Sequence, residues 1–284
     1  MRRIFSLGLL LTGLLLLGGD ALPQAFPPAT RAEMRVSRMQ QASQRVSEAD
    51  EYRVGRAVAA RLLATHPLVQ DPRLQFYVNE VGQTVARKSS RPHTFRGYHF
   101  AVLESLEPNA FAAPGGTILI TRGLLKLCAN EDELAAALAH EVAHVAHRDG
   151  ISTIIKSRRA EVAAKRRIAA AKERGGRAAE MATLYEGSIN DVFKTIATNG
   201  YGRTAEWAAD QEALRTLNRA GYNPAALAAL LTKMVAQEKR EQRGIYRTHP
   251  PTALRLAKVK MQIKDLPPEP MQKVRDQRFH ELKI

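Results

Sequence analysis

The segment that most constrains this chain is residues 140–147, which read His-Glu-Val-Ala-His-Val-Ala-His. Its first five residues form the pattern H-E-x-x-H. On a helix, His140 and His144 lie one turn apart, separated by about 6 Å of rise on nearly the same face. Two imidazoles so placed can bind one zinc ion, and Glu141 can reach a water beside that ion as a general base. The segment therefore requires a helix and predicts a metal site.

The flanking residues predict such a helix. Asn130 can cap its start, and Glu133, three residues later, completes a capping box. Alanine-rich sequence continues the helix to about Arg148, and Gly150 suits its end. The pattern H-E-x-x-H thus lies in the context that its chemistry needs.

The remaining sequence has more helical than strand character. Apolar residues recur at helical spacing in four segments, which are 36–64, 72–86, 204–220 and 223–238. Two short segments, 98–103 and 117–121, alternate or are rich in β-branched residues, and their strands can pair in one small sheet. We therefore expect an α+β protein that is predominantly α-helical.

The first residues predict export. Residues 1–3 are basic after the initiator, and residues 4–19 are almost entirely apolar. This pattern is typical of a secretory signal peptide, with small residues that suit cleavage after Ala21. The apolar run is shorter than the ~20 residues of a spanning helix, and an uncleaved anchor is the alternative.

The composition shifts along the chain divide it into segments. We expect a signal peptide over 1–21, a linker over 22–35, a catalytic domain over 36–264 and a Pro-rich, charged C-terminal tail over 265–284. A basic helical insertion is expected within the domain at about 151–200. Cys128 is the only cysteine, which excludes an internal disulfide.

The charge balance favours acidic partners. The chain carries 43 basic and 28 acidic residues, a net charge of +15, and residues 156–177 hold nine Lys or Arg against two Glu. Such a segment is ordinarily a solvated helix face. The alternative, more specific interpretation is that it contacts an anionic membrane surface. Export argues against nucleic acid as a partner. The sequence leaves the oligomeric state open.

Two histidines do not complete a catalytic zinc site, which uses three protein ligands and keeps one position open. His147 lies about two turns beyond His140, too far along the axis to share the metal, so a packing or supporting role fits it better. Glu206 and Asp210 are four residues apart and share one face of a helix. Glu206 can complete a two-histidine, one-glutamate site, and Asp210 can hold the free ring nitrogen of a ligand histidine.

These motifs together resemble the HtpX/BepA type of zinc metalloendopeptidase, gluzincins that form peptidase family forty-eight of the metallopeptidases. The family pattern R-x-x-E-x-x-x-D matches this chain from Arg203 to Asp210. Residues 109–112 resemble the family's N-A-F-A stretch, and His249, with Arg255 six residues later, resembles its H-P-x-x-x-x-R element. The resemblance spans about residues 50–260.

The resemblance implies a zincin-like domain with one Zn²⁺ per chain. The implied metal ligands are His140, His144 and Glu206, and the implied base is Glu141. It also implies a catalytic role for His249, either as a second donor to the oxyanion or as a fourth ligand that latches the zinc. The further implied residues are Asp210 and Arg203, which support the ligands, and Asn109, Ala110, Phe111 and Ala112, which bind extended substrate.

The same resemblance implies peptide-bond hydrolysis in unfolded or misfolded envelope proteins, in the periplasm and either free or associated with a membrane. A zinc-containing periplasmic chaperone or binding module with little or latched protease activity is the alternative. Family members often carry a further histidine near the position of Asp149, which we expect not to be a ligand. We also expect a soluble, exported member without the tetratricopeptide extension of some relatives.

Overall fold

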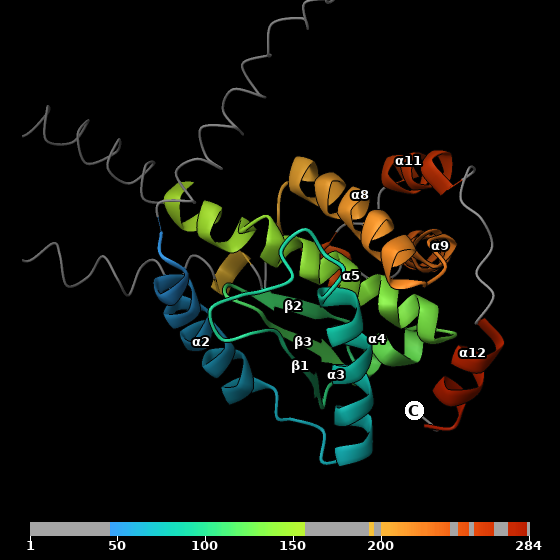
Figure 1. Cartoon of the computed structure of the whole chain (residues 1–284), viewed down its shortest axis with the longest axis horizontal. Helices are drawn as coiled ribbons and strands as arrows, with labels where there is room; N and C mark the ends of the chain where they lie inside the picture. The colour runs from blue at the N-terminus through green and yellow to red at the C-terminus, as the bar shows by residue number, and fades with distance from the viewer. Residues whose placement is uncertain are drawn as a thin grey trace, which may run out of the picture.

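The computed structural model describes residues 46–156, 193–195, 200–238, 244–249, 253–263 and 272–282. The expected leader and linker lie outside these residues, as does the basic segment 156–177 apart from Lys156. Helices predominate around one small sheet, so the predicted fold class is confirmed (Figure 1). No helix among the described residues is long and apolar enough to cross a membrane.

The sheet has three strands in the order β1-β3-β2, where β1 is His99–Leu103, β2 is Ala110–Ala113 and β3 is Thr117–Thr121. β1 pairs with β3 in parallel, as the two predicted strands were expected to pair, and β2 pairs with β3 antiparallel. The turn between β2 and β3 contains Gly115 and Gly116, whose φ angles of 79° and 111° favour glycine. In the order β1-β3-β2, β2 is an edge strand, and this tight turn joins it to β3.

Helix α5, Glu131–Ala146, runs beside this edge strand and carries the signature (Figure 1). Its whole length is buried up to Val145, because the sheet covers one side and other helices cover the other. α2, Glu48–Thr65, packs on β2 and β3, and α3, Pro72–Ala86, packs on β1 and α5. The signature histidines therefore project from a helix fixed on all sides.

The ends of α5 differ in detail from the sequence prediction. Asn130 caps the helix by accepting a hydrogen bond from the Glu133 amide at 2.9 Å, as predicted. The Glu133 carboxylate, however, accepts from the amide of Ala129 at 2.8 Å, one residue before the partner that a capping box would use. The helix ends at Ala146, and Arg148 turns the chain with a φ of 57°.

A new helical segment follows this turn directly. Residues 149–156 are helical, so Gly150 lies inside the second helix and does not end the first. The expectation that Gly150 terminates the signature helix was wrong, since Arg148 adopts the left-handed conformation instead. The turn places Asp149 at the start of the new segment, close to the signature.

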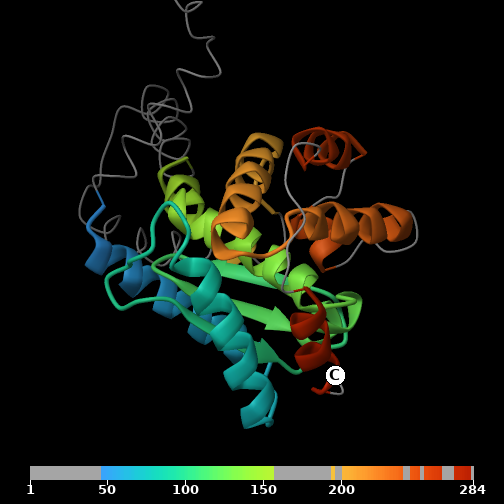
Figure 2. The ribbon, with the colours of Figure 1, turned by 45° about the vertical axis from the view of Figure 1, so that its right-hand side comes forward.

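Three longer helices stand on the side of α5 away from the sheet, as Figures 1 and 2 both show. They are α8, Arg203–Ala220, α9, Ala225–Glu238, and α11, Ala253–Gln262. α8 ends at Gly221, whose φ of 76° is the left-handed conformation that favours glycine at the end of a helix. Two short helices, α4 (Arg122–Leu127) and α10 (Ile245–Thr248), connect the longer elements.

The charged tail expected over 265–284 contains a helix, α12, Gln272–His280, which packs against α5. Arg275 lies 2.8 Å from Asp132, and Arg278 pairs with Glu131. Both carboxylates are buried at the first turn of α5. The C-terminal helix is therefore fastened to the start of the signature helix.

Candidate metal centre

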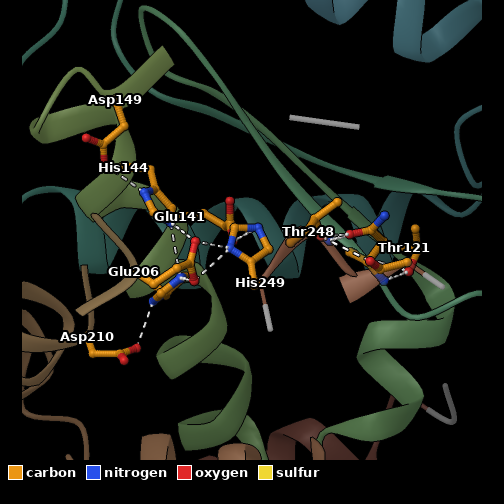
Figure 3. Close-up of polar contacts among 12 residues, drawn as sticks. Thr121, Glu141, His144, Asp149, Glu206, Asp210, Thr248 and His249 are labelled. Atoms are coloured by element: carbon orange, nitrogen blue, oxygen red, sulfur yellow. Dashed lines mark hydrogen bonds and ion pairs between the residues drawn. The ribbon is translucent and has the colours of Figure 1, made fainter. Parts of the chain in front are cut away.

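Four side chains that can bind a metal ion converge in one buried group. His140 and His144 come from α5, Glu206 from α8, and His249 directly follows α10. One ligand atom of each lies within 4.8 Å of the others, and none of the four is more than 6% exposed. Figure 3 shows Glu141, His144, Glu206 and His249 pointing toward one another. The structure thus brings the three predicted ligands and His249 together.

Each signature histidine has a carboxylate behind it. Nδ1 of His140 lies 3.1 Å from Oδ1 of Asp210, and Nδ1 of His144 lies 2.8 Å from Oδ2 of Asp149. A carboxylate accepts hydrogen bonds, so Nδ1 of His144 donates to Asp149 and Nε2 of the neutral His144 ring presents a lone pair. Asp210 therefore occupies the position expected of it, and Asp149 does the same for the second histidine.

The two Nε2 atoms face each other across 3.2 Å. When both rings are neutral with the proton on Nδ1, two lone pairs at this distance repel, whereas a shared cation attracts both. Glu206 completes the arrangement, with its carboxylate oxygens 3.3 Å from Nε2 of His140 and 3.5 Å from Nε2 of His144. Two imidazoles and one carboxylate form a donor set that suits zinc.

The charges in the group reinforce one another. Burial raises the pKa of the Glu206 carboxyl, but His249, His140 and His144 outweigh this and hold the pKa well below its usual value. Burial by itself lowers the pKa of His144, but hydrogen bonds to Asp149 and Glu206 outweigh this and raise the pKa to about 10. A metal ion must therefore displace protons from these rings, which makes its affinity depend on pH.

Glu141 lies on the same helix, turned toward His249. Its Oε1 lies 3.4 Å from Nε2 of His249. Its Oε2 is buried and accepts no hydrogen bond within the part of the chain that the structure describes. Buried carboxylate oxygens ordinarily have a partner, so this free oxygen is available to bind a proton beside the metal group.

Arg255 supplies the positive charge that braces the acidic residues. Its guanidinium lies 2.8 Å from both oxygens of Asp210 and 2.8 Å from Oε2 of Glu206, and the side chain is buried. Arg203, which was expected to support the ligands, begins α8 with an exposed side chain. The structure thus gives the supporting position to Arg255, because α11 packs on α8 and directs its arginine inward.

Asp149 is the supporting residue that the sequence analysis missed. It was identified only as a position without a ligand role, yet its carboxylate is the hydrogen-bond partner of His144 (Figure 3). A carboxylate within one turn of the end of the signature helix was the available signal. His147, by contrast, caps the end of α5 and does not belong to the four-residue group, as expected.

The predicted substrate-binding stretch forms β2 and the residue before it. The Thr121 amide of β3 donates a hydrogen bond to the Asn109 carbonyl. Backbone hydrogen bonds between antiparallel strands involve every second residue, so Phe111 also bonds to β3. The backbone groups of Ala110 and Ala112 therefore point to the opposite edge of β2. The Asn109 side chain accepts from the Ala110 amide, which leaves the Ala110 carbonyl and both groups of Ala112 for another strand.

The remaining parts of this stretch have structural roles. The Phe111 side chain is buried in a core cluster with Val58 and Leu62 of α2. The Asn109 carboxamide also accepts a hydrogen bond of 3.1 Å from Thr248, the residue before His249. The start of the edge strand is therefore tied directly to the loop that positions His249.

Comparison with known protein families agrees with this geometry. The sequence profile of peptidase family M48 matches residues 72–263, which is more than half of the chain. The chain belongs to peptidase family M48. Family M48 membership confirms the metalloprotease class and the zincin-like fold predicted from the motifs. The matched region contains every residue of the buried metal group.

Several known proteins are similar to this chain. The Beta-barrel assembly-enhancing protease of Escherichia coli (strain K12) is 28% identical over 81% of this chain and 47% of its own length. The Mitochondrial metalloendopeptidase OMA1 of Schizosaccharomyces pombe is 29% identical over 56% of this chain and 44% of its own length. The Protease HtpX homolog of Aeropyrum pernix is 40% identical over 28% of this chain. The chain spans about half the length of the first of these relatives.

Proposed function

We propose that this chain is a zinc-dependent endopeptidase that hydrolyses peptide bonds in unfolded or misfolded envelope polypeptides. One observation carries the proposal. The Nε2 atoms of His140 and His144 meet the Glu206 carboxylate at one buried point, with the free oxygen of Glu141 beside it. Three ligands and an adjacent base are the parts that peptide hydrolysis at zinc requires, and an edge strand lies beside them.

His140, His144 and Glu206 would hold the metal, which when bound supplies Lewis acidity toward water and a carbonyl oxygen. Glu141 accepts the proton of the attacking water and delivers it to the leaving amine. The unpartnered Oε2 is the atom that takes this proton. Asp149 keeps His144 in the tautomer that the ligand set needs.

His249 has two roles open to it. Its ring lies 3.2 Å from Glu206 and 3.4 Å from Glu141, so it can donate to the oxyanion that develops on the substrate carbonyl. It can also bind the metal as a fourth ligand, since it belongs to the same group of ligand atoms. The first role predicts loss of turnover on removal of His249, and the latching role predicts a gain.

The backbone of β2 supports an extended substrate. A polypeptide can add to the free edge by bonding to the Ala110 carbonyl and to both groups of Ala112. Such pairing recognises the substrate through its backbone hydrogen bonds, so it requires a segment that has no secondary structure of its own. Unfolded or misfolded polypeptides meet this requirement.

The apolar leader supports action outside the cytoplasm, most simply in a periplasm. The similarity to the Beta-barrel assembly-enhancing protease of Escherichia coli supports an envelope substrate. The basic segment 156–177 supports contact with an anionic membrane surface as well. Binding to anionic vesicles that weakens as salt rises would support this contact, and salt-independent or absent binding would count against it.

The experiment that tests the proposal measures zinc content and casein cleavage of the mature protein, with and without a chelator. We expect one zinc per chain and cleavage that the chelator abolishes and added zinc restores. Glu206→Ala should lose both the zinc and the cleavage. A zinc-loaded wild type that binds unfolded casein without cleaving it would favour a chaperone or binding module instead.

A further inference from the structure

Glu51 of α2 is a fully buried acid that takes no part in the proposed chemistry. Its Oε2 lies 2.9 Å from the Arg148 guanidinium and 3.0 Å from that of Arg91. Its Oε1 accepts a hydrogen bond of 3.3 Å from the Gly115 amide, in the turn between β2 and β3. One carboxylate thus joins α2, the turn after the signature helix and the end of the edge strand.

Arg148, in that turn, has a backbone conformation that arginine does not favour. Its φ of 57° lies in the left-handed region, which costs free energy for most residues other than glycine. Its guanidinium donates to the Val46 carbonyl at 2.7 Å and pairs with Glu51, and its side chain is only 12% exposed. These contacts anchor the side chain to the start of α2 and therefore stabilise the turn.

The turn at Arg148 determines where Asp149 lies. Asp149 is the next residue, and its carboxylate accepts the hydrogen bond of 2.8 Å from Nδ1 of His144 (Figure 3). The Arg148 carbonyl accepts from the Ser152 amide at 2.9 Å, so the left-handed residue also begins the helical segment that carries Asp149. Loss of the turn would therefore move the carboxylate that orients a metal ligand.

We infer that Glu51 is a positioning residue for the metal centre, which acts on His144 through Arg148 and Asp149. Glu51 does not belong to the group of metal ligands, so its effect is on how tightly the group binds zinc. The inference rests on the proposed zinc endopeptidase function. It adds α2, which carries none of the ligands, to the parts of the chain that determine zinc affinity.

The variant Glu51→Gln tests this role, because glutamine keeps the size of the side chain and removes the charge that binds Arg148. Zinc affinity is measured by competition with a chelating dye, at a temperature well below unfolding. We expect zinc affinity about tenfold weaker than in the wild type, the lower end of the loss caused by removing a carboxylate that contacts a ligand directly. Wild-type zinc affinity in Glu51→Gln would overturn the inference.

Glu212→Gln is the matched control for the loss of a buried acid. Glu212 is buried on α8, and its carboxylate likewise binds two arginines and one backbone amide, which belong to Arg215, Arg219 and Ser90. None of these groups belongs to the turn or to the metal group. Glu212→Gln should therefore bind zinc as tightly as the wild type, and a loss equal to that of Glu51→Gln would refute the specific role of Glu51.

Replacement of Arg148 by glycine tests the link between Glu51 and the metal. Glycine adopts the left-handed conformation without the cost that other residues bear. The double variant Glu51→Gln, Arg148→Gly should therefore bind zinc more tightly than Glu51→Gln alone. Glycine restores no contact between α2 and the turn, so recovered affinity would come from the turn itself. A double variant that binds no more tightly would contradict the link through Arg148.

Two single variants make the same comparison with Glu51 intact. Arg148→Ala and Arg148→Gly both remove the guanidinium, and only glycine favours the turn, so Arg148→Ala should bind zinc more weakly. Equal zinc affinity of these two variants would contradict the inference even if Glu51→Gln did not fold. A wild-type protein that binds no zinc would instead contradict the proposed function.

Discussion

Replacement of Asp149 by asparagine should weaken zinc binding while preserving the fold. Asp149 is the hydrogen-bond partner of Nδ1 of His144, at 2.8 Å. Asparagine has the same shape, but its amide carries no charge and can present a donor to the ring as readily as an acceptor. The ligand His144 then loses both its fixed tautomer and the charge that makes its Nε2 more basic.

The magnitude follows from the exposure of this pair. The His144 side chain is fully buried and that of Asp149 is 16% exposed, so solvent screens the interaction little. Loss of such a supporting carboxylate typically weakens metal affinity by about 10- to 100-fold. This range corresponds to roughly 1.4 to 2.7 kcal/mol of binding free energy.

The assay is competition for zinc between the protein and a chelating dye of known affinity. Casein cleavage should be reduced at limiting zinc and should recover when zinc is in excess, because Glu141 and the three ligands are still present. Asp50→Asn is the matched control, since Asp50 pairs with the exposed Arg53 on α2 and should leave zinc affinity unchanged. Wild-type zinc affinity in Asp149→Asn would refute the supporting role that the geometry gives this residue.

Three further results are expected. His249→Ala should keep its zinc and lower the turnover of casein, whereas a rise in turnover would identify His249 as a latch. Burial raises the pKa of Asp210, but Arg255 and His140 outweigh it and lower the pKa below 3.8. The ionised Asp210 carboxylate therefore stabilises the folded protein fully above about pH 4. This contribution to the free energy of unfolding is lost as the pH falls. Denaturant unfolding should then show a steeper loss of stability in acid for the wild type than for Asp210→Asn. Gly55→Ala should destabilise the protein by about 1–3 kcal/mol, because its Cβ would lie 1.7 Å from the Pro114 carbonyl oxygen; an unchanged melting temperature would contradict this packing.

The features predicted well from the sequence are local ones. The strand 117–121 and the helix 72–86 match the structure at both ends, because β-branched residues, helical spacing and an aspartate before Pro72 act within a few residues. The cap at Asn130 is similarly local. Backbone preferences of single residues are sufficient to determine these boundaries.

The features that the sequence did not predict depend on contacts between distant segments. Arg203 and Arg255 both lie in plausible motif positions, and only the packing of α11 on α8 decides which guanidinium reaches Asp210. Asp149 reaches His144 because Arg148 adopts a left-handed conformation, which single-residue preferences disfavour. Likewise, the pairing of Asp132 with Arg275 joins residues 143 positions apart, which no local pattern encodes.

The most direct test of the central claim is the rate of casein cleavage by zinc-loaded Glu141→Gln. Glutamine keeps the size of Glu141 but cannot take a proton from water. We expect one zinc per chain, as in the wild type, together with a loss of almost all cleavage. Retention of most of the wild-type rate by the zinc-loaded variant would contradict the assignment of Glu141 as the base.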